Sequence, residues 1–335
     1  MAKPVTILTG FLGAGKTTFL NATLTQKSNI KFAIIENEFG EEGIDGELIV
    51  QVKDDLVELS NGCLCCTLNE NLYDILNDLH GRQDTFDELI IETTGIADPA
   101  GVAVVFMSDP GVAKAFDLKR VVCLVDAELV EDQLRDTAEA IKQISFSDVI
   151  LLNKTENVSP EYVQQLKTML EGLNPFAKIF VGNKNQYPID EIFALERDQE
   201  FKNEPKKEEK HEHQHDHTCK HDHNHHHAHH AHGDIVSLSF RFSEPFDLHE
   251  LHHRLTVFLL FQAKDVYRVK GIVWGYDKSQ KAIVQSVGKS LSIEGGREWA
   301  ADEARISRVV FIGKMLKPAG FEKMLRQCLS KELTT

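Results

Sequence analysis

The segment Gly10-Phe-Leu-Gly-Ala-Gly-Lys-Thr17 constrains the fold more than any other part of the chain, because it fits the pattern G-x-x-x-x-G-K-[ST]. An apolar run, Val5–Thr9, precedes it, and a helical pattern, Thr17–Thr25, follows it. Strand, glycine-rich turn and helix in this order predict a phosphate-binding loop (P-loop), in which backbone N–H groups and a helix N-terminus face phosphate oxygens. The alternative, a glycine-rich turn with an accidental lysine, does not explain this context.

The P-loop predicts a role for its polar side chains. We expect Lys16 to reach the β- and γ-phosphates and the Thr17 hydroxyl to bind Mg²⁺. The residues of the loop expected to contact nucleotide are Gly10, Gly13, Ala14, Gly15, Lys16, Thr17 and Thr18.

A later apolar strand, Leu89–Glu92, ends in a carboxylate and is followed by Thr93-Thr94-Gly95. Beside a P-loop, such an acid can hold a magnesium-bound or attacking water near the γ-phosphate, and the Gly95 amide can contact that phosphate. We therefore expect Glu92 to act in catalysis together with Lys16. The structural alternative is a strand-end carboxylate that faces solvent.

The sequence Asn153-Lys154-Thr155-Glu156 follows another apolar run, Val149–Leu152. Many GTPases carry Asn-Lys-x-Asp at this place, and its acid accepts hydrogen bonds from two N–H groups of guanine. Glu156 replaces that Asp and still permits a bidentate contact, although with a different geometry. We expect Asn153, Lys154 and Glu156 to bind guanine, while the strictness of selection against adenine stays open. A polar loop after a strand is the alternative.

Three of the six cysteines crowd into Cys63-Leu-Cys65-Cys66, between a short expected strand, Leu56–Glu58, and a helix. Thiolates this close together suit Zn²⁺, Cu⁺ or Co²⁺. Three thiols leave a place for a fourth ligand, and the segment Glu36–Glu41 supplies acidic candidates at the end of an expected strand. Buried packing cysteines are the alternative. Cys123, inside an apolar strand, is assigned to the core.

Twelve of the 16 histidines lie between His211 and His232. This tract has almost no apolar residues and cannot build a core, so residues 197–233 are expected to be a flexible linker. Unprotonated imidazoles bind metal ions, which makes the tract a candidate metal collector with many weak sites. An artificial tag and an inert solvated linker are the alternatives.

Residues 1–196 alternate apolar strands with helical patterns, which predicts an α/β domain with a parallel sheet covered by helices on both faces. The expected strands are Val5–Thr9, Phe32–Glu36, Leu89–Glu92, Val121–Asp126, Val149–Asn153 and Ile179–Val181, and the expected helices are Thr17–Thr25, Leu72–Leu79, Leu129–Ile144 and Pro160–Leu170.

Residues 234–335 predict a smaller α+β domain with an antiparallel sheet. Its expected strands are Ile235–Phe242, Val266–Tyr276, Lys281–Val287 and Arg308–Ile312, and its helices run from a cap at Asp247 to Leu260 and over Pro318–Leu329.

The charge balance excludes some partners. Lys plus Arg total 37 and Asp plus Glu total 52, which gives a formal charge of -15 and argues against binding nucleic acid. No apolar run approaches the ~20 residues of a membrane helix, and the N-terminal residues do not resemble a signal peptide. We expect a cytoplasmic protein without a membrane or nucleic-acid partner.

Four motifs occur in one order along the chain: Gly10–Thr18, Ile35–Gly40, Ser60–Cys66 and Ile91–Pro99. Together they resemble the CobW-like GTPases, which include the zinc-regulated GTPase metalloprotein activators. The C-terminal part resembles the CobW C-terminal domain, notably at Tyr267-Arg-Val-Lys-Gly271. The resemblance covers nearly the whole chain, and the Cys-x-Cys-Cys motif within a P-loop protein is highly specific.

The resemblance implies a GTP-hydrolysing metallochaperone that delivers zinc, or in some branches cobalt, to client metalloproteins. Nickel ranks lower, because the related nickel-delivering proteins HypB and UreG lack the C-terminal domain. It implies GTP and Mg²⁺ at Lys16, Thr17, Glu92 and Asn153, and a transition-metal site drawn from Cys63, Cys65 and Cys66 with Glu36 and Glu41 as neighbours.

We expect a switch in which GTP with Mg²⁺ orders the loop Asn37–Asp45 and helps to complete the metal site, and hydrolysis loosens the metal. A homo-oligomer that forms with nucleotide or metal is a further expectation. Two other functions stay open: a metal storage protein with vestigial nucleotide binding, and an ATP-using kinase, chelatase subunit or cobalt-handling NTPase of a cofactor pathway. The intact P-loop argues against the first, and the guanine-type motif against the second.

Overall fold

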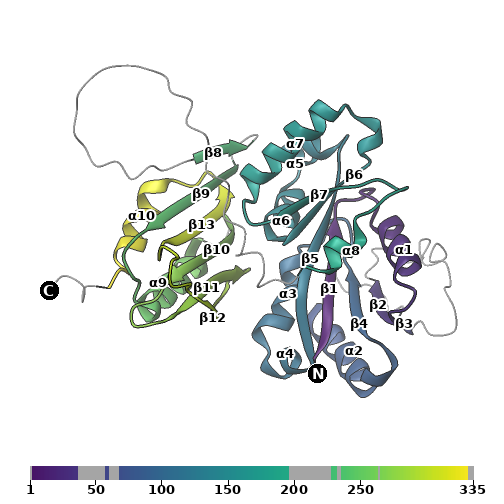
Figure 1. Ribbon diagram of the computed structural model, residues 1–335, viewed down its shortest axis with the longest axis horizontal. Helices are drawn as coiled ribbons and strands as arrows, with labels where there is room; N and C mark the ends of the chain where they lie inside the picture. Colours follow the sequence, from purple (N-terminus) through teal and green to yellow (C-terminus); the bar gives the residue numbers. More distant parts are fainter. Residues whose placement is uncertain are drawn as a thin grey trace.

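The computed structural model describes residues 2–36, 57–59, 68–195, 228–231, 235–262 and 265–330. These residues form two domains, each built around one β-sheet (Figure 1). The predicted fold class, a parallel-sheet domain followed by a smaller α+β domain with an antiparallel sheet, is confirmed. Within the described ranges, no helix is both long and apolar enough to cross a membrane.

The first sheet has seven described strands in the order β3-β2-β4-β1-β5-β6-β7, and every neighbouring pair is parallel. Their bounds are β1 Lys3–Gly10, β2 Phe32–Glu36, β3 Val57–Leu59, β4 Glu88–Glu92, β5 Phe116–Asp126, β6 Val149–Asn153 and β7 Lys178–Val181. Because all strands run the same way, the carboxyl ends of β1, β4 and β6 share one edge of the sheet. The P-loop, the segment after Glu92 and the segment after Asn153 therefore start side by side.

Helices cover both faces of this sheet, as Figure 1 shows. They are α1 Lys16–Gln26, α2 Leu68–Gly81, α3 Pro99–Ser108, α4 Pro110–Ala115, α5 Val130–Asp136, α6 Ala138–Phe146, α7 Pro160–Leu173 and α8 Ile189–Phe193. Side-chain oxygens of Asp98, Asp109 and Ser159 accept hydrogen bonds from the first turns of α3, α4 and α7, each of which has proline early in the helix.

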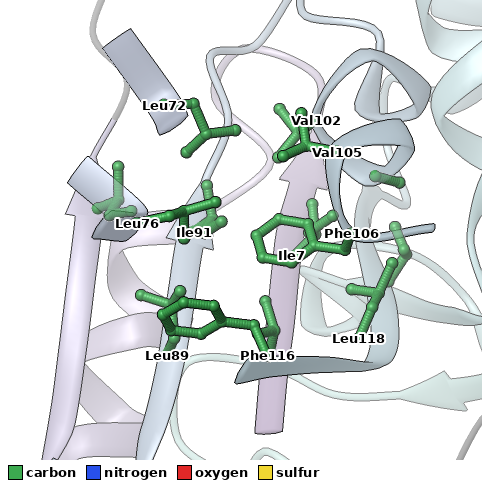
Figure 2. Packing of buried hydrophobic residues seen from close by; sticks show 14 of the residues in the cluster. Ile7, Leu72, Leu76, Leu89, Ile91, Val102, Val105, Phe106, Phe116 and Leu118 are labelled. Atoms are coloured by element: carbon green, nitrogen blue, oxygen red, sulfur yellow. The ribbon is translucent and has the colours of Figure 1, made fainter. Parts of the chain in front are cut away.

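Neighbouring residues of β1 point to opposite faces, which explains why the apolar residues Ile7 and Leu8 follow each other directly in its sequence. Ile7 joins the core that β1, β4 and β5 share with α2 and α3 (Figure 2). Leu8 joins the core on the other face, beside Phe19 and Leu20 of α1. Apolar side chains thus line both faces of the sheet. The buried group of Thr6, Glu88 and Arg120 is a polar exception.

One helix prediction was wrong. The expected helix Leu129–Ile144 is interrupted at Thr137, whose backbone is extended (φ −133°, ψ 134°). Its hydroxyl oxygen accepts a hydrogen bond of 3.4 Å from the amide of Ala140 and so starts a new helix, α6. The break lets α5 and α6 leave the sheet in different directions.

The second sheet has six described strands in the order β12-β11-β10-β13-β9-β8, all antiparallel to their neighbours. The elements are β8 Ala228–Ala231, β9 Ile235–Phe242, α9 Leu248–Gln262, β10 Val266–Trp274, β11 Gln280–Val287, β12 Ser290–Glu298, β13 Ser307–Lys314 and α10 Pro318–Arg326. The predicted cap is confirmed, since a carboxylate oxygen of Asp247 accepts from the amides of His249 and Glu250 at 2.9 and 3.0 Å. Strand β8 lies inside the range expected to be linker, so these four residues belong to the second sheet.

The two domains pack against each other. Helix α6 lies beside β10, α3 beside β11, and α7 beside β8 and β9. Val287 of β11 is part of the apolar cluster of the first domain, and Ile235 of β9 belongs to the cluster around β6 and α7. The second domain therefore contacts α3, which follows β4 in the chain, and α6, which follows β5.

Candidate nucleotide-binding site

The P-loop leaves β1 through glycines that no other residue could replace without strain. Gly10, Gly13 and Gly15 have φ values of 142°, 78° and 96°, in the region that favours glycine. A side chain on Gly15 would also lie 2.5 Å from the side-chain nitrogen of Asn153. The predicted glycine-rich turn is therefore required by the backbone itself.

Lys16 opens α1 and is buried, with 8% of its surface exposed. Its ammonium donates a hydrogen bond of 3.0 Å to the carbonyl oxygen of Gly10, across the mouth of the loop. Among the described residues no side chain caps the start of α1, and its first turn has no acidic residue. Its first amides are consequently available to an anion, as a phosphate site requires. Thr18 lies in the same turn and is exposed.

Thr17 and Glu92 meet at the same edge. The Thr17 hydroxyl donates to a carboxylate oxygen of Glu92 at 3.4 Å, and Glu92 is paired in register with Leu8 of β1. A hydroxyl and a carboxylate are hard oxygen ligands of the kind that Mg²⁺ takes together with phosphates and water. This pair of residues therefore fits the predicted magnesium site.

The segment after Glu92 packs on the P-loop. Thr93 bonds to β1 twice, from its amide to Leu8 O and from its hydroxyl to the Thr9 hydroxyl, both at 2.9 Å. Gly95 is so close that a side chain on it would lie 2.6 Å from the amide nitrogen of Leu12. The structure thus places Gly95 against the P-loop, and its contact with the γ-phosphate stays a prediction.

The base-side motif is joined to the phosphate side. The side-chain amide of Asn153, 2% exposed, donates to the Ala14 carbonyl oxygen at 2.8 Å. Lys154 has a left-handed backbone (φ 58°) and an ion pair of 2.7 Å with Asp126 at the end of β5. Glu156 lies in a short 3-10 turn, residues 155–157, and is exposed to solvent. Its carboxylate is accessible to a base that approaches from outside.

Sequence reasoning missed two residues of this site. Asp126 ends an apolar strand, as Glu92 does, and that shared pattern could have identified it. Tyr187 follows no pattern, although its ring packs edge-on against Phe19 with centroids 5.3 Å apart. Burial raises the pKa of Tyr187, the negative charge of Glu156 adds to the rise, and a hydrogen bond with Asn153 opposes it. Tyr187 thus lies near Asn153 and Glu156, two of the three predicted base-binding residues.

The predicted transition-metal ligands are only partly within the described chain. Glu36 is the last residue of β2 and is paired in register with Glu92, so its backbone lies at the nucleotide edge. Glu41, Cys63, Cys65 and Cys66 lie outside the described residues. Within the described ranges, no group of three or more His, Cys, Asp or Glu side chains is placed to hold a metal ion.

Cys123 is confirmed as a core residue. It is 1% exposed, and burial raises the pKa of its thiol to about 12. Cys328 at the end of the chain is buried as well, and burial raises its thiol pKa to about 11. Both thiols are therefore poor metal ligands and poor nucleophiles at neutral pH.

Known proteins match both domains. Residues 4–181 match the family model "CobW/HypB/UreG, nucleotide-binding domain", and residues 235–329 match "Cobalamin synthesis protein cobW C-terminal domain". The zinc chaperone YjiA of Escherichia coli is 32% identical over 93% of this chain and 94% of its own length. The zinc chaperone CobW of Pseudomonas aeruginosa is 31% identical over 98% of this chain and 92% of its own.

A solved structure of a zinc-bound triple mutant of the YjiA GTPase covers 98% of this chain and 100% of its own, with 28% identity and a TM-score of 0.71. The two family models match the two domains in the order found here, and this structure has a similar overall fold. The chain therefore belongs to the CobW family of P-loop GTPases and carries both of its domains.

Proposed function

We propose that this protein hydrolyses GTP and uses the nucleotide cycle to bind zinc and deliver it to client metalloproteins. The observation that carries the GTPase part is the bond between Asn153 and Ala14, which joins a guanine-type motif to a complete P-loop. Zinc is supported by the names of the relatives, which are zinc chaperones, and by the three clustered thiols. Co²⁺ is an alternative cargo of the same ligand chemistry.

The residues at the edge of the sheet divide the work on GTP. Lys16 exchanges its bond with Gly10 O for contacts with the β- and γ-phosphates, while the amides of the loop and of α1 cradle their oxygens. Thr17 and Glu92 hold Mg²⁺, which when bound neutralises charge on the phosphates. Asn153, Lys154 and Glu156 orient the base.

The zinc site uses Cys63, Cys65 and Cys66, with Glu36 and Glu41 as neighbours. What supports this placement is the sheet order. Strand β3 ends at Leu59, just before the cysteine segment, and β2 ends at Glu36, and both lie on the β4 side of the P-loop strand. A metal bound there shares loops with the γ-phosphate, so GTP favours zinc binding and zinc must favour GTP by the same factor.

The experiment is a competition for Zn²⁺ between the protein and a calibrated chelator, with either Mg·GTP analogue or Mg·GDP present. The protein should lack residues 210–227, which removes most of the histidine tract and keeps β8. We expect zinc to bind roughly 5- to 150-fold more tightly with the GTP analogue. Serine at Cys65 and Cys66 should remove the tight site. Equal affinity in both nucleotide states would leave a metal-binding GTPase without a switch.

A second assay tests the nucleotide. GTP should be hydrolysed in preference to ATP, and Lys16→Ala should abolish hydrolysis without unfolding the protein. Equal turnover of GTP and ATP would favour a kinase or chelatase subunit instead. The histidine tract favours one other function, metal storage, which would show many weak sites and no dependence on nucleotide. The proposal includes a client metalloprotein, which a pull-down with the zinc-loaded protein can identify. It also includes a homo-oligomer that forms with nucleotide or metal, which a measurement of the molar mass in solution can detect.

A further inference from the structure

Gln143 of α6 holds the loop that follows β4. Its side-chain nitrogen donates to the carbonyl oxygens of Gly95 and Ala97, both at 3.1 Å, and the residue is 1% exposed. Because both partners are acceptors, only the nitrogen of the amide can face them. Residues 93–98 (the post-β4 loop) are therefore clamped between the P-loop, which touches Gly95, and α6.

The C-terminal end of α6 is held by the second domain. Arg268 of β10 is 1% exposed and its guanidinium donates to the carbonyl oxygens of Ser145, Phe146 and Ser147, the first and last at 3.0 and 3.3 Å. These are C-terminal carbonyls of a helix, which lack partners inside the helix and carry partial negative charge. A buried arginine from the other domain satisfies them together with the side-chain amide of Asn174, which donates to the carbonyl oxygens of Ser145 and Ser147 at 3.2 and 2.9 Å.

Asp148 fixes this contact to the first sheet. One of its carboxylate oxygens accepts from Arg268 at 3.2 Å and lies 3.6 Å from the ammonium of Lys270. The other accepts from the amide of Val121 in β5 at 3.0 Å. The Arg268 guanidinium also lies over the ring of Phe146, 5.0 Å from its centre. The contact has directional bonds, charge pairing and burial, so it resists sliding.

The two grips on α6 are only two residues apart. Gln143 holds the post-β4 loop and Ser145 receives Arg268, and the Ser147 hydroxyl bonds back to the carbonyl oxygen of Gln143 at 2.6 Å. A helix segment this short cannot absorb a displacement by bending. Any movement of the loop at Gly95 is passed to the guanidinium of Arg268, and the reverse also holds.

We infer that Gln143 is a positioning residue that makes the contact between Arg268 and α6 depend on the nucleotide bound at the P-loop. This rests on the proposed GTPase function. When the γ-phosphate draws the post-β4 loop to itself, Gln143 carries the end of α6 along, and the docking of β10 changes. By linkage, the docked second domain alters the preference for GTP over GDP by the same factor.

The test compares hydrogen exchange of the full chain with GTP analogue and with GDP, read in peptides from β10 and from the P-loop. We expect a difference in β10 in the wild type and none in Gln143→Leu, which keeps an apolar side chain of similar size and removes the donor. The P-loop should still respond in that variant. Affinity for the GTP analogue relative to GDP should fall by roughly two- to tenfold.

Two further variants keep the test decisive. Lys142→Ala removes the exposed ion pair of 3.9 Å between α6 and Asp98 of the same loop, a surface contact worth little, and should leave the β10 response unchanged. If Gln143→Leu does not fold, Arg268→Lys should weaken the same response from the other side while keeping the charge. A β10 response that persists in Gln143→Leu, or is absent from the wild type while the P-loop responds, overturns the inference alone. Absence of any nucleotide response in the P-loop overturns the proposed GTPase as well.

Discussion

The side-chain nitrogen of Asn153 lies 2.8 Å from the backbone carbonyl oxygen of Ala14, so the end of β6 and the P-loop are one hydrogen-bonded unit. Asn153→Ala should therefore weaken binding of the phosphates as well as of the base. Loss of one such bond, about 0.5–1.5 kcal/mol, corresponds to roughly two- to tenfold weaker GTP and GDP binding. Titration with a fluorescent GDP analogue measures it. Asn157→Ala is the control: the Asn157 side chain bonds to exposed Glu128, and this variant should bind GTP and GDP normally.

The buried carboxylate of Asp126 should determine base selection through Lys154. The two form an ion pair of 2.7 Å, with the Asp126 side chain 1% exposed and that of Lys154 36% exposed. In Asp126→Asn the lysine loses the charge that holds it, so the ratio of GTP to ATP affinity should fall. Glu156→Asp, by contrast, should keep guanine binding or tighten it. Competition of GTP and ATP against one labelled nucleotide gives both ratios, and an unchanged ratio in Asp126→Asn would show that Lys154 needs no support.

Stability should depend strongly on the buried ion pair between Glu88 and Arg120. Their charged atoms are 2.8 Å apart and the side chains are 9% and 6% exposed. Glu88→Ala leaves a buried guanidinium without that carboxylate and should reduce the free energy of unfolding by about 3–5 kcal/mol. Asp117→Ala, on β5 with Arg120, breaks an exposed ion pair with Lys119 and should lower the free energy of unfolding by less than about 1 kcal/mol. Urea unfolding compares the two, and equal losses would contradict the burial argument.

The two buried thiols should be inert in the folded protein. In a variant with serine at Cys63, Cys65, Cys66 and Cys219, only Cys123 and Cys328 remain. Burial raises the pKa of these thiols to about 12 and about 11, so almost no thiolate exists at pH 8. A thiol reagent should label neither residue until denaturant is added, and both afterwards. Rapid labelling of the folded chain would contradict their assignment to the core.

The same thiols predict a loss of stability in alkali. Burial raises their pKa values above the usual thiol value of 9.0, so the unfolded chain releases these protons first as the pH rises. The stability of the folded state should fall from about pH 9 upwards. Adding Cys123→Ala to the four-serine variant leaves Cys328 as its one thiol. The difference between the two slopes of unfolding free energy against pH then gives the contribution of Cys123.

Much of the nucleotide edge could be predicted from sequence, because its signals are local. The glycines of the P-loop, the acid at Glu92 and the motif at Asn153 each follow an apolar strand, and a parallel sheet brings such strand ends together. The strands β2 and β6 have the predicted bounds for the same reason. Local sequence was enough to predict these residues, because the positive φ values of the P-loop require glycine.

Other features depend on tertiary contacts and leave no local trace. The break at Thr137 inside a continuous helical pattern is decided by how α5 and α6 pack. Helix α3 is apolar nearly all round and shows no period. The edge strand β12 is largely exposed and alternates only briefly, at Leu291 and Ile293, before two glycines. Tyr187 and Arg268 reach their partners only after distant segments meet, so their roles follow from the structure alone.

The place of β1 has a consequence for how the chain is made. It is the first of the described strands in chain order, yet it pairs with β4 and β5, as in Val5 with Leu89 and Lys3 with Phe116. At about 5–20 residues per second, β1 waits several seconds on the ribosome for both neighbours, and such non-local pairing also slows folding. A nascent chain thus acquires its phosphate cradle only after β5 emerges, when more than a third of its 335 residues exist. Nucleotide binding can therefore stabilise the nascent chain only after β1 has paired with both β4 and β5.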